Sequence, residues 1–353
     1  MSRAVFAAAL FFCLVNPSAA SAWGYQGHKV VGAIADQMLS DNARQQVKRI
    51  LGERIKLQQA GPWADYVKSV QLKDGAYSYV VDPDHYEYEV PCKPFRDERD
   101  LMVGFASRNW TSCPYLPDPT KPPLGCHNTF HFDDVAIQRN GFDRSFKGTN
   151  EHDLVATIGA AITVLSGKPV PAGFAFAINE REALLLLAHM IGDLHQPLHV
   201  GSIYLDTSGK LVDPDAAPQI DPATETAGGN ALQDQTLNLH HEWDDIPTDL
   251  GEGSTRELLA AAKRVPTSQG QIEDWPAAWA SESILVARDA FAGLTFNFNP
   301  PQPPETRNQW SVSFDDHTAY LWQMDQIKRR QLAKGGARLA QILNKIWRLD
   351  QAR

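Results

Sequence analysis

Residues 183–201 hold the strongest candidate for a chemical site in this chain. His189 and Asp193 are four residues apart, which places both side chains on one face of a helix. Pro197 ends the helical pattern, and His199 follows where the chain turns away. The alternative is a buried helix whose polar side chains are hydrogen-bonded in the core. We favour a cation site, because a buried carboxylate such as Asp193 is costly unless it is paired or bound to a metal.

A second pair with the same spacing lies in residues 238–244, where His240 precedes Asp244 by four residues. Both pairs are flanked by apolar or aromatic residues, and two such pairs are much less expected by chance than one. The segment follows Gly228 and Gly229, and glycines permit a tight turn and close approach of the backbone. The repeat strengthens the interpretation of a metal centre.

The N-terminal residues predict export. Arg3 is followed by an apolar run and by the small residues 20–22, the pattern of a cleaved secretory signal peptide over residues 1–22. An uncleaved membrane anchor is the weaker alternative, since the run is too short to span a membrane comfortably. Cleavage would make Trp23 the first residue. Its free α-amino group, with a pKa of about 8, can bind metal, and His28 lies close enough in sequence to bind the same ion.

The elements that must position these residues are mainly helices. Residues 82–126 are rich in Pro, Asp, Cys and aromatic residues without sustained periodicity, and predict a long irregular region. Residues 128–135 form a short aromatic segment of extended type. The fold class is therefore mainly α, with one large domain and few short strands. Apolar residues recurring at helical spacing predict helices over residues 29–39, 42–51, 152–165, 180–195 and 313–345.

The composition is that of an ordinary globular protein, with 43% hydrophobic and 21% charged residues. The formal charge of −9 argues against a general nucleic-acid binder, which would normally be basic. Bound metal would reverse that sign locally. Cys92, Cys113 and Cys126 follow the signal peptide, so one disulfide is expected and one thiol is left over. The spacing leaves the pairing open.

Taken in order, these residues resemble the zinc-dependent single-strand-specific nucleases of fungi, plants and bacteria, the S-one/P-one nuclease family. The motif that carries the resemblance reads His-x-x-x-Asp-x-His-Gln-Pro-Leu-His from His189 to His199. Gly-Gly-Asn and Asn-Leu-His-x-x-Trp-Asp follow it. The resemblance covers nearly all of residues 23–353, and the zinc phospholipases C share its metal core.

The resemblance implies a mostly helical fold of the phospholipase C and single-strand nuclease type that binds three Zn²⁺ ions. By the resemblance, Asp193 would bridge the first and third ions. The first ion would be held by Asp65, His131, His189 and Asp193; the second by His199, His240 and Asp244; and the third by Trp23, through its amino group and carbonyl, with His28 and Asp193. On the residues alone, Asp65 reads as a helix cap or a surface partner of Lys68.

The family has one histidine in a short aromatic strand after the Trp-Ala-Asp motif, and this chain offers His85 and His131. His131 is followed by Phe-Asp-Asp, which matches the family's His-aromatic-x-Asp pattern better. It also lies the expected short distance before the helix predicted at residues 152–165. We choose His131, which makes residues 70–127 largely an insertion.

Four further residues take their expected roles from the resemblance. Phe132 would stack a nucleobase and Asp134 would hydrogen-bond its edge, the alternative being a core aromatic and a turn carboxylate. Lys68 would steady the phosphate as a point charge. Asn230 would contact phosphate or a water on the metal.

The function that this resemblance implies is hydrolysis of single-stranded DNA or RNA to 5′-nucleotides, with 3′-nucleotidase activity. Nucleic acid and nucleotides would be the substrates, and neither a stable membrane association nor a protein partner is implied. The protein would be secreted or periplasmic. The alternatives are a secreted zinc phospholipase C and an inactive secreted binding protein. Asp244, where the phospholipases have Glu, favours the nuclease, and the many imidazoles favour zinc over calcium or magnesium.

Overall fold

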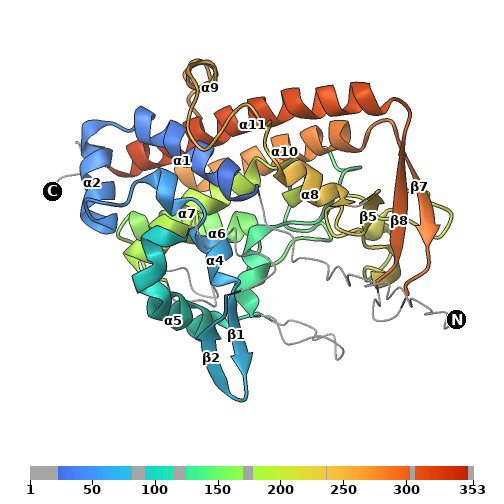
Figure 1. Ribbon diagram of the computed structural model, residues 1–353, viewed down its shortest axis with the longest axis horizontal. Coiled ribbons are helices and arrows are strands. Elements are labelled where there is room, and N and C mark those ends of the chain that lie inside the picture. The colour runs from blue at the N-terminus through green and yellow to red at the C-terminus, as the bar shows by residue number, and fades with distance from the viewer. Residues whose placement is uncertain are drawn as a thin grey trace, which may run out of the picture.

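The computed structural model describes residues 23–81, 92–113, 125–169, 178–235, 237–302 and 307–348. The expected signal peptide and His85 lie outside these residues. Helices make up most of the regular structure, which confirms the mainly α fold (Figure 1). They are α1 (Tyr25–Met38), α2 (Asp41–Leu51), α3 (Leu57–Ala60), α4 (Trp63–Val67), α5 (Arg99–Asn109), α6 (Leu154–Leu165), α7 (Glu180–Leu194), α8 (Leu239–Asp244), α9 (Arg256–Ala262), α10 (Trp275–Phe291) and α11 (His317–Ile346).

Helix α7 lies at the centre of the fold. The Asn179 side chain accepts a hydrogen bond from the backbone N–H of Glu182, and the Glu182 side chain accepts one from the N–H of Asn179. Every residue from Glu182 to Leu194 is buried, because α1, α6 and α11 all pack against this helix. Figure 1 shows α11 running above α6 and α7 across much of the molecule. The metal-ligand candidates on α7 are thus shielded from water.

The strands are short, and one parallel pair matters for the site. β3 (Val135–Ala136) pairs with β4 (Gly201–Ser202), and the backbone N–H of Asp133 donates to the carbonyl of His199 at 2.7 Å. This pairing brings the segments after His131 and His199 side by side. The others are the hairpin β1 (Val70–Lys73) and β2 (Ala76–Tyr79), and a sheet in the order β6 (Leu237–Asn238), β5 (Leu232–Asp234), β8 (Gln309–Phe314), β7 (Leu294–Asn299).

Three local predictions from the sequence were wrong. The last helix begins at His317 instead of residue 313, because residues 309–314 pair with β7 and β5 as strand β8. Residues 126–131 form a 3-10 helix and are not extended; extended backbone begins at Phe132. Helix α5 occupies part of the region expected to be irregular, where Phe105 packs against the Trp63 ring with 5.3 Å between centroids.

One disulfide joins Cys113 to Cys126, which answers the pairing that the sequence left open. Cys92 lies outside it, with its sulfur 3.8 Å from the Tyr79 hydroxyl. Cys126 is the first residue of the 3-10 helix that ends at His131. The disulfide therefore ties the segment after α5 to the element that carries His131.

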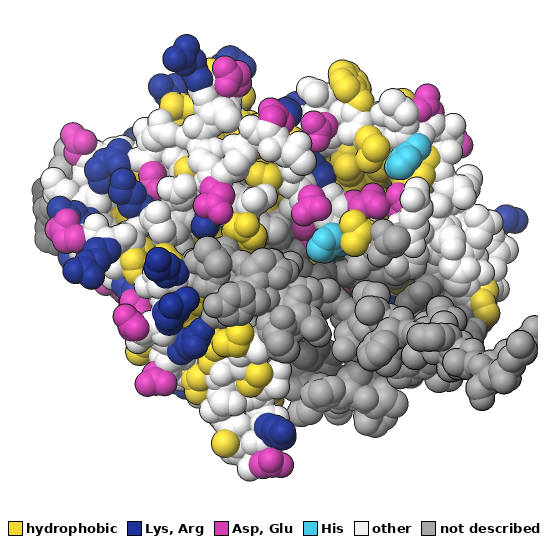
Figure 2. Space-filling model, in the orientation of Figure 1, with side chains coloured by type: hydrophobic (Ala, Val, Ile, Leu, Met, Phe, Trp, Pro, Cys, Tyr) yellow, Lys and Arg dark blue, Asp and Glu magenta, His cyan; other side chains and the backbone are white. Residues whose placement is uncertain are grey.

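The surface is mixed in charge. On the face in Figure 2, Lys and Arg side chains gather at the end formed by α2 and α5 and again at α9, while Asp and Glu side chains are scattered over the described part of the face. No broad basic strip crosses the described part of this face. In the described chain, no helix is both long and apolar enough to cross a lipid bilayer.

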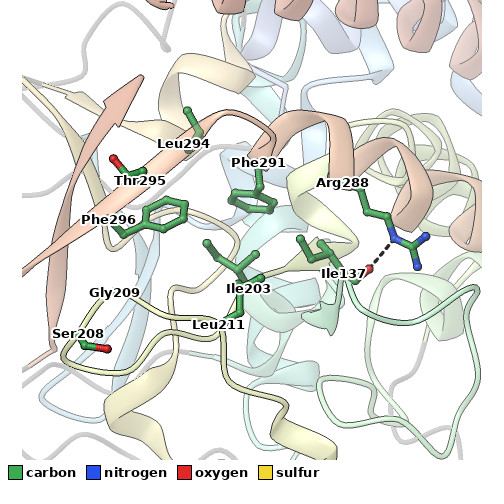
Figure 3. Close-up of a pocket in the computed structure, with 10 residues that line it drawn as sticks. All are labelled: Ile137, Ile203, Ser208, Gly209, Leu211, Arg288, Phe291, Leu294, Thr295 and Phe296. Carbon is green, nitrogen blue, oxygen red and sulfur yellow. Dashed lines mark hydrogen bonds between the residues drawn. The ribbon is translucent and has the colours of Figure 1, made fainter. Parts of the chain in front are cut away.

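A cavity of about 380 Å³ lies between β7, the end of α10 and the loop after β4 (Figure 3). Its walls are mainly apolar and include Ile203, Phe291 and Phe296. The Arg288 guanidinium points away from these side chains and donates to the Ile137 carbonyl at 2.7 Å. The cavity shares no lining residue with the metal-ligand candidates.

Candidate metal centre

Helix α7 supplies two side chains of the centre. His189 and Asp193 are both fully buried and are one helical turn apart. The Nε2 atom of His189 lies 3.2 Å from Oδ2 of Asp193. Gly192 leaves room beside them, since a Cβ there would come within 2.7 Å of Nδ1 of His28. The apolar residues of α7 thus exclude water around a polar pair.

His131 and Asp65 complete what we call the first group: Asp65, His131, His189 and Asp193. The Nδ1 atom of His131 lies 3.1 Å from Oδ2 of Asp193 and 3.0 Å from Nε2 of His189. Asp65 comes from α4, and its Oδ1 lies 3.7 Å from His189 Nε2 and 3.9 Å from His131 Nδ1. Four potential ligand atoms from three separate chain segments therefore converge.

The second group is His199, His240 and Asp244. The two Nε2 atoms of His199 and His240 lie 3.1 Å apart. Asp244 faces both, with Oδ1 3.7 Å from His199 Nε2 and Oδ2 3.6 Å from His240 Nε2. All three residues are buried. They come from the 3-10 turn after α7 and from α8.

Backbone carbonyls orient three of these imidazoles. The carbonyls of Gly61, His131 and Gly228 accept hydrogen bonds, each 2.7 Å long, from the Nδ1 atoms of His189, His199 and His240, respectively. Gly228 has φ +59°, and a Cβ there would lie 2.4 Å from the Leu198 carbonyl oxygen.

These hydrogen bonds determine which ring nitrogen is available. A carbonyl can only accept, so each Nδ1 carries the proton and each Nε2 presents a lone pair. In the second group, two such lone pairs face each other across 3.1 Å. That arrangement is unfavourable without a cation between them, and it is the arrangement that a metal requires.

What we call the N-terminal group is the third set implied by the resemblance: Trp23, His28 and Asp193. The structure also brings His28 together with Asp65 and His189. His28 Nε2 lies 3.2 Å from Oδ1 of Asp193, the oxygen that does not face the first group. Both ring nitrogens of His28 are buried without a hydrogen-bond partner among the described residues. Trp23 is fully buried, and the N–H of the next residue, Gly24, donates to the Asp244 carbonyl at 2.9 Å. The first described residues are therefore held against the centre.

Burial sets the protonation of these ligands. It lowers the pKa of His28 to about 4, with His189 adding to the effect, and lowers that of His131 to about 3, with Lys68 adding. It also lowers the pKa of His240 to about 4. Burial alone would raise the pKa of Asp193, but the facing His189 and other imidazoles hold it well below its usual value. At neutral pH, His28, His131 and His240 are therefore neutral and Asp193 is ionised, which is the form that binds metal. Two ligands differ: the facing carboxylates of Asp193 and Asp65 raise the pKa of His189 against the effect of burial, and burial raises the pKa of Asp244 to about 7.

The donor set fits zinc. Imidazole nitrogens and single carboxylate oxygens are the ligands that Zn²⁺ prefers, whereas Ca²⁺ and Mg²⁺ take mostly oxygen. The orphaned ring nitrogens of His28 and buried oxygens of Asp193 (Oδ1) and Asp244 (Oδ2) have no hydrogen-bond partner among the described residues. Cations in these groups would engage His28 Nε2, Oδ1 of Asp193 and Oδ2 of Asp244.

The other predicted site residues lie at different places around the centre. Lys68 Nζ pairs with Oδ1 of Asp65 at 2.8 Å, so it borders the first group. Phe132 is 37% exposed. Burial, together with Glu225, raises the pKa of Asp134 to about 6. Asn230 Nδ2 donates to the Ala227 carbonyl at 2.8 Å, within its own turn.

Gln196 was part of the sequence motif but received no role from sequence reasoning. Its side-chain amide donates to Oδ1 of Asp244 at 2.7 Å. The Gln lies three residues after Asp193 and three before His199. This position between two candidate ligands was the one sequence feature that could have indicated its role. His195, by contrast, donates to the Ile191 carbonyl and accepts from Arg338, so its ring takes part in neither group.

The chain matches the model of the S1/P1 nuclease family over residues 23–113 and 111–348. A mainly helical fold around buried His and Asp groups, matched over almost all of the described chain, defines the class: the chain belongs to the S1/P1 nuclease family and is a nuclease. Zinc dependence is a general property of that family.

Three similar proteins are endonucleases of the plant Arabidopsis thaliana. Endonuclease 2 of Arabidopsis thaliana is 25% identical over 350 residues, which cover 92% of this chain and 90% of the relative. Endonuclease 1 of the same plant is 24% identical over 367 residues, covering 96% and 92%. Endonuclease 3 is 31% identical over 195 residues, about half of each chain.

Proposed function

We propose that this nuclease is an exported, trinuclear zinc phosphodiesterase that hydrolyses single-stranded DNA and RNA to 5′-nucleotides and also has 3′-nucleotidase activity. The observation that carries the proposal is the convergence of buried ligand atoms on Asp193, whose two carboxylate oxygens face different imidazoles. The first group, the second group and the N-terminal group would each hold one Zn²⁺.

Bound zinc would supply positive charge for a phosphodiester and would lower the pKa of water toward about 7. The protein's own residues do the rest. Asp65, whose Oδ1 pairs with Lys68, can accept a hydrogen bond from the attacking water and so help to orient it. Lys68, whose ammonium is 2.8 Å from Asp65, lies where it can donate to a phosphate oxygen.

Because the protein is acidic overall, attraction of a negatively charged phosphate must come from positive charge at the site itself. The chain carries a formal charge of −9, and acidic side chains are spread over the face in Figure 2. Phosphate would therefore be drawn to the centre by the charge held there and by Lys68, since a general basic surface is lacking on that face.

Phe132 supports the preference for unpaired strands. It directly follows His131 and is 37% exposed, so its ring can stack on a nucleobase beside the first group. A base within a duplex cannot reach that ring without unpairing. Asp134, two residues further on, would accept a hydrogen bond from the base edge.

Replacing Phe132 by alanine is expected to raise KM for single-stranded DNA about 5- to 150-fold, because stacking on an aromatic ring contributes about 1–3 kcal/mol per base. Steady-state kinetics on a short oligonucleotide would measure this. Trp322→Ala, which removes an aromatic side chain that is 68% exposed on α11, is the control and should leave KM unchanged. An abasic oligonucleotide should show no difference between Phe132→Ala and the wild type. Equal KM values on the normal oligonucleotide would contradict base stacking.

Export rests on the N-terminal signal pattern, and we propose a mature protein that begins at Trp23, placed outside the cytoplasm in the periplasm or medium. The burial of Trp23 and the bond from Gly24 to Asp244 support this N-terminus, since a free amino group could then serve as a ligand.

The test of the proposed function is hydrolysis by purified protein beginning at Trp23. Single-stranded DNA, duplex DNA and phosphatidylcholine vesicles would each be incubated with and without a chelator. Release of 5′-nucleotides from the single strand, abolished by the chelator, with duplex and lipid largely untouched, is the expected result. Cleavage of lipid alone would identify a phospholipase and overturn the proposal, as would chelator-resistant hydrolysis.

A further inference from the structure

Gln196 is fully buried, and its side-chain amide both accepts and donates a hydrogen bond. Its Oε1 accepts the backbone N–H of Leu198 at 2.6 Å, and its Nε2 donates to Oδ1 of Asp244 at 2.7 Å. The residue stands between the end of α7 and the 3-10 turn Pro197–His199. A buried amide with both bonds satisfied is fixed in orientation.

The hydrogen bond from Gln196 makes the two oxygens of the Asp244 carboxylate different: one accepts the amide N–H and the other is left available as a metal ligand. Oδ1 is occupied by the Gln196 amide, whereas Oδ2 is buried, lacks a hydrogen-bond partner among the described residues and lies 3.6 Å from His240 Nε2. An oxygen that already accepts a strong hydrogen bond is the poorer ligand. The amide therefore directs Oδ2 toward the lone pairs of the second group.

The bond to Leu198 acts on a second ligand. Leu198 immediately precedes His199, and the Gln196 side chain caps the turn on which His199 lies. One side chain thus fixes both the turn that carries His199 and the carboxylate of Asp244, two ligands 45 residues apart in sequence.

We infer that Gln196 is a positioning residue of the second group, which sets the geometry of His199 and Asp244 for one Zn²⁺ and touches neither the metal nor the substrate. The inference rests on the proposed function, in that the second group binds zinc. Residues that orient metal ligands by hydrogen bonds typically change metal affinity about 10- to 100-fold when removed.

Two variants of Gln196, with one control, distinguish an effect on the position of the metal ligands from a general loss of folding stability. Gln196→Ala removes both bonds. Gln196→Glu keeps the size and the acceptor for the Leu198 N–H, but a carboxylate cannot donate to Asp244 and repels it. The matched control is Asn109→Ala, which removes another fully buried amide, one that donates to the Phe105 carbonyl at 2.9 Å on α5.

Stepwise zinc affinities of the metal-free proteins, measured by competition with a chelator, are the main readout. We expect both Gln196 variants to lose about 10- to 100-fold in affinity for one zinc equivalent, with a much smaller change in the other two, which are linked to the second group only through the hydrogen bond between His199 and His131. Saturating zinc should restore activity, with kcat recovering and KM for single-stranded DNA unaltered throughout. Asn109→Ala should lower the unfolding temperature and keep all three affinities.

Different outcomes overturn different claims. If both Gln196 variants are folded by near-UV circular dichroism and keep all zinc affinities within twofold, the inference is wrong while the proposed function stands. A loss in Gln196→Ala alone would place the effect in the Leu198 turn, and would overturn the claim that Asp244 is positioned by this amide. Wild-type protein that binds no zinc would overturn the proposed function, and this inference with it.

Discussion

Asp193→Asn is expected to remove zinc from two of the three groups at once and to abolish most nuclease activity. Asn keeps the size of the side chain but not its charge, and the two oxygens of Asp193 face the first group and His28 separately. Removing one partner of a buried charge pair typically costs about 3–5 kcal/mol. That corresponds to a loss of about 10²- to 4 × 10³-fold in zinc affinity for each group that uses the carboxylate.

The measurement is zinc content after dialysis against a zinc buffer, together with hydrolysis of single-stranded DNA. Asp153→Asn is the matched control, because Asp153 is also fully buried but caps α6 through the Ala156 N–H at 2.9 Å. It should keep wild-type zinc content. An Asp193→Asn protein with three zinc ions and normal activity would show that the shared carboxylate is not a ligand.

Removing zinc is expected to lower the unfolding temperature as well as activity, and adding zinc should restore both. Without a cation, the buried lone pairs of His199 and His240 face each other and Oδ2 of Asp244 has no partner. A ligand that binds only the folded state stabilises it by about 4 kcal/mol when its free concentration is 1,000 times its Kd.

Differential scanning calorimetry of chelator-treated protein, before and after metal is returned, measures this effect. Mg²⁺ at the same concentration is the control and should leave the unfolding temperature near that of the metal-free protein, because imidazole ligands suit zinc and not magnesium. An unfolding temperature that does not respond to zinc would mean that the groups are hydrogen-bonded core residues.

Local spacing could predict only part of the centre. The i, i+4 relation of His189 and Asp193 follows from helix geometry, and the buried leucines around them made α7 evident. His131 was chosen over His85 from a short pattern, and the structure places His131 3.1 Å from Asp193, whereas His85 lies outside the described residues. The expectation that segments so far apart in sequence converge on one centre came from the family resemblance, because periodicity gives no information on contacts between distant segments.

Features that depend on tertiary contacts escaped prediction. Strand β8 exists because β5 and β7 flank it, although its residues also fit the start of a helix. The role of Gln196 depends on its hydrogen bond to Asp244, 48 residues away, and no local sequence pattern indicates that contact. The insertion expected over residues 70–127 stays a prediction: α5 packs in the core there, and the family model extends through residue 113.

The hydrogen bond from His199 Nδ1 to the carbonyl of His131 has a thermodynamic consequence. The backbone of His131, a ligand in the first group, holds the ring of His199, a ligand in the second. An ion that immobilises His131 therefore also reduces the conformational entropy that His199 must lose when it binds its own ion. Such linkage is reciprocal: each occupied group raises the affinity of the other by the same factor. The first and second groups should therefore bind zinc with positive cooperativity, each filling more readily once the other is occupied.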